Sequence, residues 1–318
     1  MDRIGAEVHT TPGTESNVKE VYEKSFQLKK DNPETIVIFN QFEEFGNAVW
    51  HYVCTGQAIK DVFTQLRTDN QRLRALFLTQ GSAGTLCAGD YLREIYPQIK
   101  ICAGEALQCP TLLYNGYGEH RIEGIGDKHI PWIHNIKNMD MVAGIDDEYC
   151  IRLLRLFNEP LGREFLQSRG IVEEFTNKLD LLGISGIANL IGCIKMAKYY
   201  EMKKNDVVFT VATDSMDFYQ SRLAEQREQN GSYSDLQAGM DYEACLMSLS
   251  IDHMNELNYW DKKRIHNLKY FTWVEQLGKN VSELDRQWND HEYWREKYLS
   301  HLKWDKQNKE FNEKTGLQ

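Results

Sequence analysis

Small and hydroxyl-bearing residues gather in one short stretch, Thr79-Gln80-Gly81-Ser82-Ala83-Gly84-Thr85. The apolar run 75–78 before it predicts a buried strand, and the periodic pattern after Thr85 predicts a helix. Glycines let backbone N–H groups close around an anion, and a helix N-terminus adds partial positive charge. The hydroxyls of Ser82 and Thr85 can donate further hydrogen bonds. The stretch predicts a phosphate site, with a simple tight turn as the alternative.

Two common nucleotide motifs do not fit this stretch. No lysine follows Gly84, so it is not the phosphate loop of a nucleotide triphosphatase. Its glycine spacing also falls short of the dinucleotide-binding fingerprint.

Composition narrows the class of protein. The chain has 318 residues, 42% of them hydrophobic, which is enough for a sizeable core. Its net charge of −10 argues against nucleic acid as a partner, and no apolar run is long enough to span a membrane. Seven cysteines without a C-x-x-C spacing predict reduced thiols and a cytoplasmic protein. We predict no metal site.

Strand-like and helix-like segments alternate along the first two-thirds of the chain. The predicted strands are 36–39, 75–78, 99–104, 141–145 and 207–213. The predicted helices are 14–30, 51–66, the segment after Thr85, 148–157 and a late helix with core residues Ile187, Leu190, Ile191 and Ile194, for which Ser185 is the expected N-cap. This alternation predicts an α/β fold, a parallel sheet flanked by helices. From Met216 the chain becomes Trp-rich and polar, which predicts a helical C-terminal extension.

Several polar residues follow directly after predicted strands. They are Gln41, the stretch 81–85, Glu105 and Ser215. Ligands in parallel sheets bind beyond the carboxyl ends of the strands. These residues are therefore expected to share one crevice.

Taken together, these stretches resemble the pyridoxal-phosphate enzymes of fold type II, the group of the tryptophan synthase β-chain, cysteine synthase and threonine dehydratase. The order and spacing of the motifs agree with that family from Ile4 to about Tyr219. The similar motifs are Asn40-Gln41-Phe42 with Asn47, His51 and Thr55-Gly56, then Gly81–Thr85, Arg121–Gly126, Gly183–Gly186 and Thr213-Asp214-Ser215.

The resemblance implies pyridoxal phosphate as cofactor and a role for each motif. Gly81, Ser82, Ala83, Gly84 and Thr85 would hold the phosphate, Gly124 and Gly126 would pass beside the ring, and Ser215 would bind the ring nitrogen. Gln41 would bind the carboxylate of a small amino-acid substrate. A shift of one position would instead bring the Asp214 carboxylate to the ring. The structural alternatives are that Ser215 only caps a turn and that Gln41 only satisfies backbone groups. The implied reaction is β-elimination, β-replacement or ammonia-lyase chemistry.

The family's Schiff-base lysine has no counterpart in this sequence. It belongs to an N-terminal lobe, of which residues 1–35 resemble only the end; 36–219 would be the cofactor-binding domain and 220–318 the extension. Lys128 lies near the expected ring position, but lysines in irregular loops are usually solvated. We therefore expect no catalytic residue in this chain, and either a homodimer or association with a chain that carries the missing lobe. The alternatives are a non-catalytic, regulatory pyridoxal-phosphate subunit and an unrelated α/β phosphate-binding module.

Overall fold

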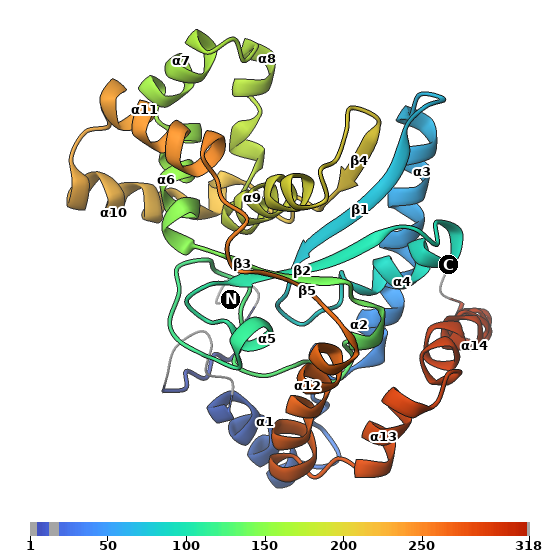
Figure 1. Ribbon diagram of the computed structural model, residues 1–318. Coiled ribbons are helices and arrows are strands. Elements are labelled where there is room, and N and C mark those ends of the chain that lie inside the picture. Colours follow the sequence, from blue (N-terminus) through green and yellow to red (C-terminus); the bar gives the residue numbers. More distant parts are fainter. Residues whose placement is uncertain (1–4, 13–18, 317–318) are drawn as a thin grey trace.

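A five-stranded sheet forms the centre of the computed structural model, which describes residues 5–12 and 19–316 (Figure 1). The strand order is β4-β1-β2-β3-β5. The first four of these strands are mutually parallel, and β5 pairs with β3 in the antiparallel sense. The predicted α/β fold is confirmed, with one antiparallel edge strand that the sequence did not reveal. The strands are β1 (Arg72–Thr79), β2 (Lys100–Ala106), β3 (Met141–Ile145), β4 (Asp206–Phe209) and β5 (Met254–Glu256).

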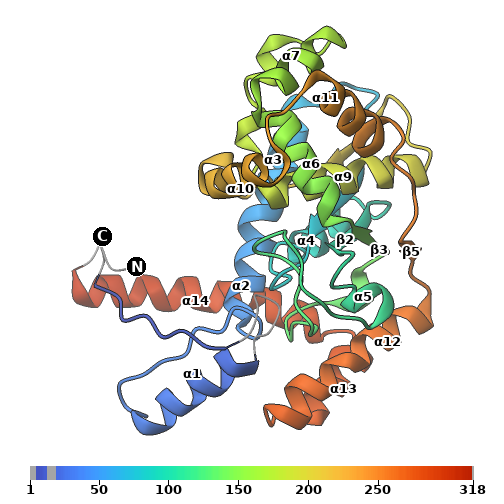
Figure 2. The same cartoon turned by 90° about the vertical axis from the view of Figure 1, so that its left-hand side faces the viewer.

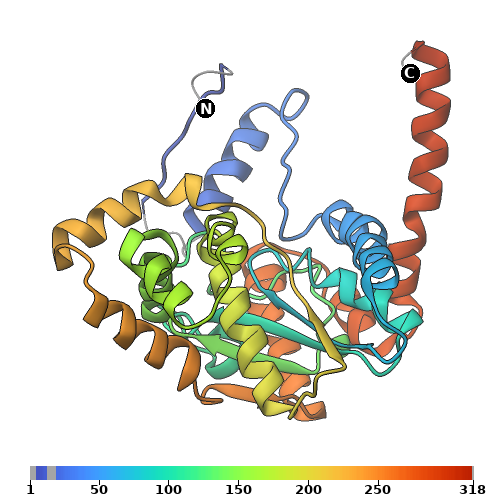
Figure 3. The same cartoon turned by 90° about the horizontal axis from the view of Figure 1, so that it is seen from above.

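Helices cover both faces of the sheet, which explains why residues 75–78 of β1 are all apolar. Ala75 and Phe77 belong to a core cluster shared with α6 (Asp147–Asn158) and α9 (Ile184–Tyr199). Leu76 and Leu78 belong to a second cluster, on the side of α3 (Gly56–Leu66) and α4 (Cys87–Ile95). Alternate side chains of a strand point to opposite faces, so a central strand with two covered faces loses the polar alternation of a half-exposed strand. Figure 3 shows α3 and α9 on opposite sides of the strands.

The helix α9 packs as predicted at two of its four expected core positions. Ile187 and Ile191 are buried, whereas Leu190 and Ile194 are only half-buried against the same cluster. Ser185 is not the N-cap: it lies inside the first turn, and Gly183 caps the helix without a side-chain hydrogen bond.

The predicted strand 36–39 is wrong. These residues form no strand, and Val37 and Phe39 are 70% and 90% exposed. An apolar run needs a neighbouring strand to satisfy its backbone groups, and the five paired strands described above do not include this segment. The next helix begins earlier than predicted, with α2 (Phe45–Trp50) and a π-helical turn (His51–Thr55) leading into α3. Before them lies α1 (Lys19–Asp31); the predicted start of this helix at Thr14 falls outside the described residues.

The irregular segment between β2 and β3 is ordered by its buried apolar side chains. Ile122, Ile130 and Ile133 have no exposed surface, and Trp132 is almost as buried. It contains the short helix α5 (Thr111–Tyr114); two further helices, α7 (Pro160–Ser168) and α8 (Glu173–Thr176), follow α6.

The described part of the C-terminal extension, residues 220–316, is mainly helical as predicted, and it joins the same fold. Its helices are α10 (Gln220–Asn230), α11 (Asp235–Tyr242), α12 (Tyr259–Lys269), α13 (Val281–Asn289) and α14 (Tyr293–Thr315). It also supplies β5 to the sheet, and Leu223, Ala238 and Cys245 to the core. Figure 2 shows the end of α14 projecting from the body of the molecule. In the described ranges, none of the helices combines the length and apolar character needed to cross a bilayer.

Candidate cofactor site

The predicted phosphate loop lies between the buried strand β1 and the helix α4. The loop is anchored at its start, where Thr79 N donates to Asn189 Oδ1 (2.8 Å) and Gln80 N donates to Gly104 O (2.7 Å). It is closed onto α4 by three backbone bonds of 2.9–3.1 Å, from the N–H groups of residues 87, 88 and 89 to the carbonyls of residues 84, 85 and 86. A strand, a small-residue loop and a helix start are therefore joined as the sequence predicts.

The backbone of this loop offers donors rather than acceptors. Within the described part of the chain, the N–H groups of residues 81–85 make no hydrogen bond. Ala83 adopts a positive φ of 64°, which bends the chain so that successive N–H groups can converge. Consecutive unsatisfied N–H groups next to a helix N-terminus are the usual way in which proteins bind phosphate. This arrangement fits the phosphate of pyridoxal phosphate.

Two glycines of the loop leave no room for a side chain. A Cβ at Gly84 would come within 2.2 Å of Asn47 Oδ1, and a Cβ at Gly81 within 2.8 Å of Gly124 O. Asn47 itself donates from Nδ2 to Ser82 Oγ at 3.0 Å and to Gln41 O at 2.9 Å. The small residues are therefore required by the close approach of α2 and of the 121–126 segment.

The loop forms one wall of an open pocket of about 560 Å³, a volume typical of small-molecule sites. Other walls come from widely separated parts of the sequence, as predicted for residues beyond the strand ends. The lining residues are Gln41, His51, Thr79, Gly81, Ser82, Ala83, Gly84, Thr85, Glu123, Gly124, Ile125, Ser185, Thr213, Asp214, Phe218, Tyr219, Ser221 and Arg222.

The two predicted ring-side glycines have different positions. Gly124 lines the pocket with a φ of +83°. Gly126 is not part of the lining. Its N–H donates to Gln80 O at 2.8 Å, which connects the 121–126 segment to the start of the loop. A Cβ at Gly126 would also approach His120 Nε2 to 2.6 Å.

Asp214, and not Ser215, faces the pocket. Ser215 Oγ accepts from Asp217 N at 3.4 Å and so caps the short 3-10 helix Met216–Tyr219. Asp214 Oδ2 accepts from Tyr219 Oη at 2.6 Å, while its buried Oδ1 has no hydrogen-bond partner among the described residues. The structure thus favours the alternative in which a carboxylate stands at this end of the site, and the role of Ser215 at the ring stays a prediction.

Glu105 does not join the pocket, although it was expected there. It lies inside β2, is buried, and accepts 2.8 Å hydrogen bonds from the N–H groups of Leu112 and Leu113. Burial raises the pKa of this carboxyl to about 8, against the backbone donors, which lower it. Glu105 therefore has a structural role as the cap of α5.

The lysine nearest in sequence to the predicted ring position is also outside the site. Lys128 is exposed, and its Nζ lies 5.3 Å from the centre of the Tyr117 ring. No lysine of the described residues lines the pocket.

His51 and Arg222 are lining residues whose contribution we did not predict. His51 Nδ1 lies 2.8 Å from Thr55 Oγ1, and burial lowers the pKa of its imidazole. It lies four residues after Asn47, and this spacing places both side chains on one face of a continuous helix, a signal visible in the sequence. Arg222 forms an ion pair with Glu123 across the pocket edge. No local pattern could have shown this pair, because the partners are 99 residues apart.

Known proteins are similar to this chain in sequence and in fold. No family model matches. A cysteine synthase of Staphylococcus aureus is 28% identical over 226 residues, which make up 70% of this chain and 63% of that enzyme. The chain thus spans less than two-thirds of the length of this relative. An O-acetylserine-dependent cystathionine β-synthase from Helicobacter pylori is similar in structure, with a TM-score of 0.52 at 25% identity over 69% of this chain and 63% of that one.

In sequence and in fold, this chain is similar to the cysteine synthases of fold type II. A hydrogen sulfide-producing enzyme of Fusobacterium nucleatum has the same fold, with a TM-score of 0.57 at 24% identity, and the match covers 80% of this chain and 68% of that enzyme. Enzymes of the cysteine synthase family depend on pyridoxal phosphate. In the described ranges, the N–H groups of the loop at residues 81–85 make no hydrogen bond and are donors of the kind that bind phosphate.

Proposed function

We propose that this chain binds pyridoxal phosphate in the pocket beyond β1. The observation that carries the proposal is the run of N–H groups at residues 81–85, which belong to the pocket wall and donate to no protein acceptor in the described ranges. Ser82 and Thr85 would add hydroxyl donors to the same phosphate. Charge-assisted hydrogen bonds of this kind are stronger than neutral ones.

The other pocket residues would place the ring and an amino-acid substrate. Gly124 permits close approach of the backbone to the ring face, and Asp214 offers a free carboxylate oxygen to a ring nitrogen. Gln41 would donate its side-chain amide to the substrate carboxylate. When bound, the cofactor withdraws electrons from the α-carbon of the amino acid, which permits loss or replacement of a β-substituent. The proposed class of reaction is therefore β-elimination, β-replacement or ammonia-lyase chemistry on a small amino acid.

The proposed chemistry also needs a group that accepts the proton of the substrate α-carbon. In related chemistry a lysine both anchors the cofactor and moves the proton. Since no lysine of the described residues lines the pocket, we propose that catalysis needs a lysine from outside this pocket, through a homodimer or a chain with the N-terminal lobe. The second candidate function, favoured by the same observation, is a non-catalytic pyridoxal-phosphate subunit that associates with an active homologue.

The cysteines are in keeping with the proposed cytoplasmic location. All seven are free thiols, and only Cys54 is exposed to solvent. Burial raises the pKa of Cys87, Cys102 and Cys150, which keeps these thiols protonated and unreactive.

Cofactor titration with borohydride trapping tests the proposal. We expect saturable, reversible binding of pyridoxal phosphate, much weaker binding of pyridoxal, and no stoichiometric adduct at one lysine after borohydride reduction and peptide mapping. The double variant Ser82→Ala/Thr85→Ala should weaken binding about tenfold or more. As a matched control, Thr64→Ala/Ser300→Ala removes two hydroxyls that donate to carbonyls of their own helices, and it should not change the affinity for pyridoxal phosphate.

Stoichiometric labelling of Lys128 together with amino-acid turnover would contradict the proposed absence of a catalytic lysine. Equal affinity for pyridoxal and pyridoxal phosphate would contradict the phosphate site.

A further inference from the structure

One side chain of the C-terminal extension contacts both helices that flank the phosphate loop. Tyr298 of α14 is 3% exposed, and its ring stacks on Tyr52 with the ring centres 4.3 Å apart and the planes within 5°. Its hydroxyl donates to the carboxylate of Asp90 in the first turn of α4. Tyr298 therefore links the α2 region to α4 and does not itself line the pocket.

The two linked helices are those that shape the loop. The α2 region carries Asn47, which donates to Ser82, and His51, which lines the pocket. The first turn of α4 supplies the three N–H groups that close the loop. A relative movement of these helices would change the spacing of the phosphate donors. Tyr52 Oη also donates to Glu94 Oε1 on α4 at 2.7 Å, so the stack lies within a continuous connection.

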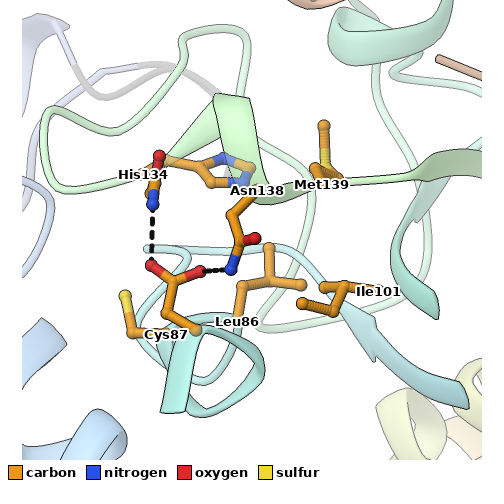
Figure 4. Close-up of a pocket in the computed structure, with 8 residues that line it drawn as sticks. Leu86, Cys87, Ile101, His134, Asn138 and Met139 are labelled. Carbon is orange, nitrogen blue, oxygen red and sulfur yellow. Dashed lines mark hydrogen bonds between the residues drawn. The ribbon is translucent and has the colours of Figure 1, made fainter. Parts of the chain in front are cut away.

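Asp90 is held in place by donors from two parts of the chain. Asn135 Nδ2 donates to Oδ2 at 2.9 Å, and Asn138 donates to Oδ1. Figure 4 shows the side chain of Asn138 with its hydrogen bond, near Cys87. Of these three donors to Asp90, Tyr298 is the one from the extension. A second extension residue, Lys269 of α12, supports the same region, since its buried Nζ donates to the carbonyls of Trp132 and His134 and to Gln287 Oε1 at 2.7–2.9 Å.

We propose that Tyr298 is a positioning residue for the phosphate loop, and that the C-terminal extension is a brace which fixes α2 and α4 around the bound phosphate. The proposal rests on the proposed function. It assigns to residues 259–315 a role in cofactor affinity although none of them lines the pocket.

Amide hydrogen exchange in the absence of any ligand tests whether Tyr298 restrains the helices around the phosphate loop. In Tyr298→Phe the stacked ring stays and the bond to Asp90 is lost. We expect the amides of Cys87, Ala88 and Gly89 to exchange about tenfold faster than in the wild type, the factor for loss of one hydrogen bond to a charged group. Tyr293→Phe is the matched control, because this buried tyrosine of α14 donates to Glu283 of α13 and not to the flanking helices. Equal effects of both variants, or no effect of Tyr298→Phe, would overturn the brace.

Cofactor titration of the same three proteins then connects the brace to the phosphate. Tyr298→Phe should weaken pyridoxal phosphate about tenfold and leave pyridoxal unchanged, while Tyr293→Phe should change neither. An equal loss for both ligands would show a general loss of structure and overturn the positioning role. If the wild type binds no pyridoxal phosphate, the proposed function and the role of Tyr298 in affinity both fail, but the exchange experiment still decides whether the extension braces the loop.

Discussion

Asn47 donates its side-chain amide to the hydroxyl of Ser82 at 3.0 Å, and so joins α2 to the loop that follows β1. The other end of the same amide, Oδ1, occupies the space in which Gly84 would carry a side chain. One asparagine therefore fixes the position of the loop and requires a glycine within it. The consequences for binding can be tested at Gly84 without changing any polar group.

We expect Gly84→Ala to remove cofactor binding. The added Cβ would lie 2.2 Å from Asn47 Oδ1 and 2.8 Å from His51 Cδ2, so the loop and α2 must separate. Overpacking of this kind costs about 1–3 kcal/mol of stability. Urea unfolding and pyridoxal-phosphate titration measure the two effects. Gly46→Ala is the control: it meets nothing within 4 Å and lies in α2, where alanine is the better helix former. Undiminished affinity in Gly84→Ala would show that the tight contact has no part in the site.

The core of α9 gives a prediction that does not depend on the cofactor. Ile191 is 1% exposed in the cluster that contains Phe77, so Ile191→Ala should lower the free energy of unfolding by roughly 2–5 kcal/mol. Leu190→Ala, at the half-buried neighbouring position, should cost clearly less. Equal costs at the two positions would contradict the orientation of the helix.

Two buried histidines should make the fold less stable in acid. Burial lowers the pKa of His129 to about 4, and burial together with the charge of Lys269 lowers that of His266 to about 3. In the unfolded chain each of these histidines binds a proton near pH 6.5, whereas in the folded chain it stays neutral. The contribution of the two histidines to the free energy of unfolding is therefore highest above pH 6.5 and falls as the pH drops below it. The raised pKa of Glu105 has the opposite effect. The stability that the folded state gains from the protonated carboxyl is lost as the pH rises from about 4.5 to 8.

A comparison of variants isolates the histidine effect. His129→Gln removes the titrating group and keeps a polar partner for Tyr22, whose hydroxyl lies 3.0 Å from His129 Nε2. The stability difference between wild type and variant should be constant above pH 6.5 and shrink by about 2 kcal/mol at pH 5, since each pH unit is worth about 1.4 kcal/mol. Urea unfolding at a series of pH values measures it. A difference that stays constant down to pH 5 would mean that His129 titrates normally.

Local patterns in the sequence predicted the centre of the fold where distant partners also support it. The apolar run 75–78 forms the predicted strand because β2 and β4 pair with it, and residues 81–85 form the predicted loop because the close contacts around it admit only small residues. The segment 36–39 has the same local pattern and forms no strand, since strand formation also needs a partner distant in sequence. The edge strand β5 is only three residues long and is defined by pairing with β3, more than a hundred residues earlier.

The candidate site also combines features that the local sequence predicts with features that depend on contacts between distant residues. The phosphate loop, Gln41 and Gly124 were predicted from their positions after strands and in motifs, and all of them line the pocket. The contact between Tyr298 and Asp90 joins residues 208 positions apart, and no periodicity in either segment indicates it. Ser215 and Asp214 are neighbours, so motif spacing alone could not decide which of them faces the pocket; the cap that Ser215 forms on the following turn decides it.

The last prediction separates these two residues by their effect on the ring. Asp214 lines the pocket and has a buried oxygen without a hydrogen-bond partner in the described ranges, whereas Ser215 Oγ accepts from the N–H of Asp217. We therefore expect Asp214→Asn to weaken pyridoxal phosphate several-fold and to leave the affinity for inorganic phosphate unchanged, because the loop at residues 81–85 is untouched. Asparagine keeps the size of the side chain and an acceptor for Tyr219, which donates to Asp214 at 2.6 Å, so the fold should remain.

Ser215→Ala serves as the matched comparison for Asp214→Asn. Loss of the cap should cost about 0.5–2 kcal/mol of stability, with little change in affinity for either ligand. Titration of both variants with pyridoxal phosphate and with inorganic phosphate measures the two affinities, and urea unfolding measures the stability. If Ser215→Ala weakens pyridoxal phosphate and Asp214→Asn does not, the hydroxyl implied by the family resemblance binds the ring, and the 215–217 turn must rearrange when the cofactor enters.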